Sequence, residues 1–181
     1  PKKDFGSWVV LCEDDKGRLI AGDQYGSLYR FDRPASGETL DDKDLEKIDL
    51  DIGHAWGLLY AFDSLYVVVN EKKHKGRGLY RIQDTNGDDK FDKVTLLKKF
   101  QEVGGEHGPH AVVLSPDGKS LYVACGNQTA LPDYQSSRVT ECWSEDTLQP
   151  RVYGRGFMKG VEAPRGWICK TGPEGKNWEV V

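Results

Sequence analysis

The densest cluster of ionisable side chains in this 181-residue sequence lies in the glycine-rich segment GGEHGPH, residues 104–110. Glu106, His107 and His110 are close together in it. Histidine exchanges protons near neutral pH, and a neighbouring carboxylate can orient it as a general base. Imidazole and carboxylate are also common zinc and iron ligands, although His-Gly-Pro-His is not a known metal spacing. The alternative is that these side chains cap loop backbone groups and line a wet channel.

A second cluster, DTNGDDKFD at residues 84–92, has the alternating oxygen ligands of a calcium loop. The candidate ligands are the side chains of Asp84, Asn86, Asp88 and Asp92 and the main-chain carbonyl of Lys90. Against a calcium site, Asp89 stands where such loops have glycine, and Thr95 stands where they have glutamate. The alternative is a hairpin turn in which Asp and Asn side chains bond to their own backbone.

The elements that must position these clusters are β-strands. Short runs rich in Val, Leu, Tyr and Trp alternate with turn residues such as Asp-Lys-Gly at 15–17 and Asp-Gly at 117–118, a pattern typical of hairpins. The runs repeat: Leu19, Leu65 and Leu121 each open the second strand of a unit, 46 and 56 residues apart. SLYRFD at 27–32 and GLYRIQD at 78–84 are near copies.

Repeats of this length with four strands each indicate propeller blades. We therefore predict an all-β fold, a partial β-propeller of about three four-stranded antiparallel blades. The blades are expected at residues 5–51, 52–102 and 103–181, with a long insertion at 126–165 in the third. The insertion is either a functional excursion over one face or a cover for the blade edges. The fourth strands are predicted in KIDLD (47–51), DKVTLLKKF (92–100) and NWEVV (177–181).

The chain begins at Pro1 without methionine and ends in a strand-like run, which predicts a piece of a larger propeller. The remaining blades are then its first expected partner. Three blades alone would leave two apolar faces uncovered, so we expect this chain to associate or to be poorly soluble.

In a propeller, functional groups converge where the first strand of each blade begins. Aligning the hairpins makes Trp8, Trp56 and His110 equivalent at these starts, with Phe5, Gly53 and His107 equivalent one turn earlier. The channel mouth is then expected to carry five side chains: His54, Trp56, Glu106, His107 and His110.

Composition excludes several classes. A net charge of −4 gives no electrostatic attraction for nucleic acid, and no apolar stretch is long enough for a transmembrane helix. The four cysteines form no CxxC, so neither a zinc ribbon nor a covalent haem motif is present in the sequence, although one disulfide is possible.

The segment HGPHAVVLSPDGKSLYVACGN, residues 107–127, resembles soluble quinoprotein sugar dehydrogenases of the aldose and sorbosone type. In that pattern a histidine stands nine residues before the Pro of Pro-Asp-Gly, as His107 stands before Pro116. The resemblance implies a sugar or alcohol dehydrogenase using pyrroloquinoline quinone (PQQ), with His107 as the base and His110 less so. It also implies His54 and Trp56 near the cofactor, although Trp56 departs from the family's glutamine.

The whole chain is similar to the propeller of large secreted planctomycete-type proteins described as membrane-bound dehydrogenases. That resemblance rests on WGLLYAFDSLYVVVN, GLYRIQDTNGDDKFD and APRGWICKTGPEGKNWE, among other segments. It implies a periplasmic or extracellular location and a c-type haem domain as partner. The competing hypotheses are a non-catalytic propeller that binds glycan or protein through an aromatic mouth, and a scaffold for a haem domain.

Overall fold

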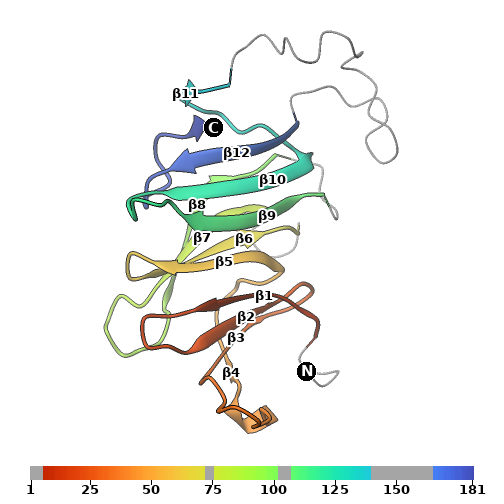
Figure 1. Cartoon of the computed structure of the whole chain (residues 1–181), viewed down its shortest axis with the longest axis vertical. Coiled ribbons are helices and arrows are strands. Elements are labelled where there is room, and N and C mark those ends of the chain that lie inside the picture. The colour runs from red at the N-terminus through yellow and green to blue at the C-terminus, as the bar shows by residue number, and fades with distance from the viewer. Residues whose placement is uncertain (1–5, 72–75, 102–106, 140–164) are drawn as a thin grey trace.

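The computed structural model describes residues 6–71, 76–101, 107–139 and 165–181. These residues form three β-sheets stacked face to face, with the N-terminal sheet at one end and the C-terminal sheet at the other (Figure 1). No α-helix occurs among them; one short 3₁₀ turn spans Asp42–Asp44. The all-β prediction of successive propeller blades is confirmed.

The first two sheets each contain four antiparallel strands in sequence order, as in a propeller blade. The first sheet consists of β1 (Trp8–Glu13), β2 (Leu19–Asp23), β3 (Leu28–Phe31) and β4 (Glu46–Lys47). The second consists of β5 (Ala55–Ala61), β6 (Ser64–Val69), β7 (Gly78–Gln83) and β8 (Lys93–Lys99). Their turns follow the sequence signals: Asp14 accepts hydrogen bonds from the backbone N–H groups of Lys16 and Arg18, and Gly17 adopts φ 78°.

The third sheet differs from the prediction because it has five strands. Its order is β11 (Ser136–Ser137), β13 (Glu179–Val180), β12 (Arg165–Thr171), β10 (Leu121–Ala130) and β9 (Pro109–Leu114). The additional strand β11 pairs in parallel with β13, because the backbone N–H of Gln135 bonds to the carbonyl of Trp178 and that of Arg138 to the carbonyl of Val180.

The predicted insertion also begins later than expected. Residues 126–130, assigned to a loop from the sequence, continue β10, and Ala130 pairs with Arg165. Polar residues extend this strand because their backbone groups have partners, such as Gly126 N–H on the carbonyl of Gly108. Farther along the predicted insertion, residues 131–139 are described and include β11, whereas residues 140–164 lie outside the described residues.

Apolar side chains between the sheets form two cores. Between the first and second sheets lie Ile20, Leu28, Leu65, Val67, Tyr80 and Ile82, among others. Between the second and third sheets lie Tyr66, Val68, Leu79, Leu121, Val123 and an aromatic group. In that group, the rings of Phe100, Trp167 and Trp178 meet edge to face at centroid distances of 5.4, 6.1 and 6.3 Å.

The first strand of every blade carries a β-bulge near its start. The register shifts at Val9 in β1, at Trp56 in β5 and at His110 in β9. The sequence alignment that made Trp8 equivalent to Trp56 and His110 was therefore wrong by one residue. The bulge residue equivalent to Trp56 and His110 is Val9. Counting back from the second strand missed this because the first turns differ in length: Glu13 pairs with Leu19, Tyr60 with Leu65 and Leu114 with Leu121.

Candidate functional site

Two of the predicted mouth residues come together on neighbouring blades. Trp56 of β5 and His110 of β9 are both partly buried bulge residues, and their rings meet edge to face at 5.1 Å. The two strands can approach this closely because of Gly57, where an added Cβ would lie 2.7 Å from the carbonyl oxygen of His110. Bulges commonly re-aim side chains next to functional sites.

The ring of His110 is held in one orientation by its own loop. Its Nδ1 lies 2.6 Å from the carbonyl oxygen of Gly108. A carbonyl oxygen only accepts hydrogen bonds, so Nδ1 carries the proton. In the neutral ring, Nε2 then has the lone pair, which can accept a hydrogen bond or a proton from a ligand.

His107 is exposed, and its backbone is fixed against the extension of β10. Its N–H donates to Oε1 of Gln128 at 3.2 Å, and the N–H of Gln128 donates to its carbonyl oxygen at 2.9 Å. Gly126 is required here, because an added Cβ would lie 2.3 Å from the carbonyl oxygen of His107. The sequence analysis missed Gln128 as a positioning residue, since it fell in the segment assigned to the insertion.

His54, assigned to cofactor binding, joins the first blade to the second. It is 5% exposed, and its Nδ1 lies 3.0 Å from the carbonyl oxygen of Gln24. Its backbone N–H donates to Gly26, and its carbonyl accepts from Asn70. The remaining mouth candidate, Glu106, lies outside the described residues.

The predicted calcium-loop side chains bond to the loop's own backbone. Asp84 accepts from the N–H groups of Gly87 at 2.7 Å and Asp89 at 2.8 Å, and more weakly from that of Asn86. Burial raises the pKa of Asp84, but these N–H groups outweigh that effect and hold it below its usual range.

The other predicted ligands of this loop make turns of the same kind. Asn86 accepts from Asp88 N–H, Asp88 from Lys90 N–H, and Asp92 from Thr85. Among the described residues, no group of three or more His, Cys, Asp or Glu side chains is arranged to hold a metal ion. The calcium site, with Asp84, Asn86, Asp88, Lys90 and Asp92 as ligands, stays a prediction.

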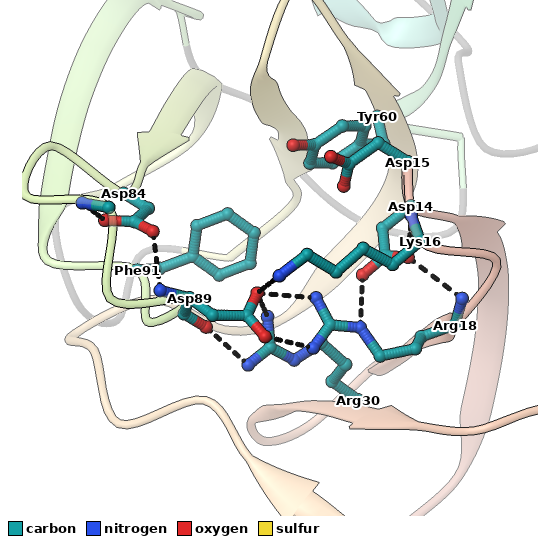
Figure 2. Close-up of a pocket in the computed structure, with 10 residues that line it drawn as sticks. Asp14, Asp15, Lys16, Arg18, Arg30, Tyr60, Asp84, Asp89 and Phe91 are labelled. Atoms are coloured by element: carbon teal, nitrogen blue, oxygen red, sulfur yellow. Dashed lines mark hydrogen bonds and ion pairs between the residues drawn. The ribbon is translucent and has the colours of Figure 1, made fainter.

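Asp89, which replaces the expected glycine, links the first two blades (Figure 2). Its backbone is left-handed, with φ 68°, and its carboxylate points toward three cations of the first blade. Arg18 donates to it twice, at 2.7 and 2.8 Å, Lys16 lies 2.9 Å away, and Arg30 donates to its carbonyl oxygen at 2.7 Å. Arg18 and then Lys16 hold the pKa of Asp89 far below its usual range.

This charged group surrounds a cavity of about 120 Å³. Sites for small organic ligands are usually larger than roughly 300 Å³, so the cavity does not suit a sugar or a cofactor. The first strands begin at one end of the blades, whereas the β1–β2 and β7–β8 turns lie at the other end. The Trp56–His110 pair and the Asp89 cluster are therefore separate sites.

The fold defines the class of protein: an all-β chain built of propeller-type blades, with a Trp–His pair near the start of the first strands of its second and third blades. No family model and no curated protein matches the chain. No helix among the described residues is long and apolar enough to cross a membrane.

Proposed function

We propose that this chain forms one wall of a propeller channel that binds a small sugar or a glycan end. The observation that supports this function is the contact between Trp56 and His110 on adjacent bulges. The tryptophan ring, which is only partly buried, provides an apolar surface for the C–H face of a sugar. Nε2 of His110 accepts a hydrogen bond from a sugar hydroxyl, because the proton is on Nδ1, which donates it to the carbonyl oxygen of Gly108.

A sugar-titration experiment tests this proposal. Monosaccharides and short glycans are titrated into the 181-residue chain, and tryptophan fluorescence and imidazole NMR signals are recorded. We expect saturable binding that Trp56→Ala abolishes and His110→Gln weakens. Tyr134→Ala is the matched control, because Tyr134 is 43% exposed and belongs to the third blade's outer segment. Equal affinity in Trp56→Ala and the wild type would reject the site.

A second candidate function is oxidation of the bound sugar or alcohol, and the exposure of His107 favours it. Two hydrogen bonds with Gln128 hold the backbone of His107 against β10, three residues before His110. An imidazole placed there can take the proton of a substrate hydroxyl. In the resembling dehydrogenases the hydride goes to PQQ, which supplies the redox chemistry when bound.

The residues assigned to PQQ meet only part of its requirements. Trp56 offers a ring on which a quinone can stack, but His54 is buried with Nδ1 directed at Gln24. The carboxylates of the cofactor also need cations. The cationic group formed by Lys16, Arg18 and Arg30 lies at the opposite end of the blades. PQQ therefore remains a proposal that rests on the resemblance.

The oxidation hypothesis has its own experiment. The chain is titrated with PQQ and Ca²⁺ by calorimetry, and dye reduction is followed with the sugars that bind. Saturable PQQ binding and dye reduction that His107→Ala abolishes would support a dehydrogenase. Sugar binding without either signal would leave the binding function and remove the enzymatic one. The haem-domain partner and the periplasmic or extracellular location remain proposals on the same resemblance.

A further inference from the structure

The two contacts between neighbouring sheets, here called joints, contain equivalent ion pairs. Arg30 of β3 and Arg81 of β7 occupy the same place in the near copies SLYRFD and GLYRIQD. Arg30 contacts Asp89 in the turn between β7 and β8. Arg81 pairs with Glu174 in the turn between β12 and β13. In both joints, a cation on the third strand of one sheet meets a carboxylate in the outer turn of the next sheet.

The far face of the third sheet also carries a cation at the equivalent position of its third strand, namely Lys170. Lys170 pairs in register with Tyr122, just as Arg81 pairs with Tyr66 one blade earlier. Around it lie apolar side chains at positions that are covered in the second sheet: Val113 is 53% exposed and Ile168 is 47% exposed. This face is the end of the stack opposite the first sheet (Figure 1).

The far face of the first sheet carries exposed apolar side chains beside an acidic outer turn. Leu11 is 54% exposed on it, and the ring of Trp8 stacks on Tyr29 and Phe31 at 6.0 and 5.3 Å. The outer turn beside it, residues 32–45, carries five carboxylates and two cations, so it is acidic. The exposed carboxylates of this turn are Asp32, Glu38, Asp41, Asp42 and Asp44.

We propose that a second copy of this chain docks head to tail, the first sheet of one copy on the third sheet of the other. The acidic turn of residues 32–45 then faces Lys170, as Glu174 faces Arg81 inside the chain. The exposed side chains of Leu11 and Ile168 become covered, which supplies the hydrophobic driving force. A contact between two identical third-sheet faces would place no acidic outer turn opposite Lys170. The contact is therefore heterologous.

Mixing two blocked variants tests this geometry. Ile168→Glu blocks the third-sheet face and Leu11→Glu blocks the first-sheet face, and both residues are exposed, so folding is retained. Sedimentation is measured from micromolar to submillimolar chain concentrations, with circular dichroism to verify the fold. We expect the wild type to associate, and each variant alone to associate at least about tenfold more weakly than the wild type. An equimolar mixture of the two variants should form a dimer, because each supplies the face that the other lacks.

The control is Leu96→Glu, which changes a 43% exposed leucine on the middle sheet and should associate as the wild type does. Association of Ile168→Glu or Leu11→Glu alone, at wild-type strength, would mean that like faces pair and would overturn the proposal. A wild-type chain that stays monomeric at every concentration would also overturn it. In that case the two faces would be left for further blades of a longer polypeptide.

Discussion

Asp89→Asn should weaken the joint between the first two blades. Asparagine tolerates the left-handed backbone at this position, φ 68°, so the substitution removes the charge with little change in backbone strain. The two hydrogen bonds from Arg18 and the ion pair with Lys16 lose their charge assistance. The side chains of Arg18 and Arg30 are only 17% and 6% exposed, so water replaces the carboxylate poorly.

The magnitude follows from geometry and exposure. Exposed ion pairs contribute up to about 1 kcal/mol, and hydrogen bonds to charged groups contribute about 1.5–3 kcal/mol. The Asp89 side chain is 40% exposed, which requires a discount for solvent screening. We therefore expect Asp89→Asn to lower the free energy of unfolding by about 1–2 kcal/mol at pH 7 and low salt.

The pH dependence gives an independent check. The pKa of Asp89 is lower in the folded chain than in the unfolded chain, where it is about 3.9. Its stabilising effect is therefore complete above the unfolded pKa, and it is lost as the pH falls below about 4 toward the folded pKa. In Asp89→Asn this loss is absent, so the difference between wild type and variant should shrink with acidification.

Urea unfolding followed by circular dichroism measures both effects, at a chain concentration below that of association. Asp32→Asn is the matched control, because it removes an exposed carboxylate from the outer turn of the first blade and should leave stability unchanged. The reasoning is refuted if Asp89→Asn unfolds within about 0.3 kcal/mol of the wild type, less than the smallest net hydrogen bond. It is equally refuted if the difference between the two proteins does not depend on pH.

Three further expectations concern the core and the mouth. Trp178→Ala removes a 2% exposed ring and should lower the free energy of unfolding by about 3–5 kcal/mol in a thermal or urea transition; a loss below about 1 kcal/mol would contradict the packing. Burial raises the pKa of the Cys12 thiol to about 12 and that of Cys169 to about 11. Iodoacetamide at pH 8 should therefore label both at least about a hundredfold more slowly in the folded chain than in urea, and equal rates would exclude the burial argument. Gly126→Ala should displace the backbone of His107, changing its imidazole NMR signals and weakening sugar binding; unchanged signals would show that the loop does not depend on this contact.

Local patterns in the sequence determined the strands and their order. Apolar runs separated by Asp-Gly and Asp-Lys-Gly turns predicted the hairpins, and the copies SLYRFD and GLYRIQD predicted equivalent third strands. The leucines at 19, 65 and 121 do begin or nearly begin β2, β6 and β10. This prediction succeeds because the strand period and turn geometry depend on neighbouring residues.

The positions of side chains depended on contacts between distant segments. The bulges at Val9, Trp56 and His110 move the register by one residue, and no local pattern marks them. The polar strand 126–130 has its partners in distant segments: the loop of His107 on one side and Arg165 of β12 on the other. A strand made of residues with weak strand propensity needs such tertiary partners.

The Asp89 loop shows the same division. Its alternating Asp and Asn residues predicted a tight turn, and the structure has that turn. Only tertiary structure gave Asp89 its role, because Arg18 and Arg30 lie 71 and 59 residues away in the chain. The sequence by itself therefore determined strands, turns and repeats, since these arise from local backbone preferences. Which charges and rings meet was decided by the stacking of the sheets, which brings together residues that no local pattern connects.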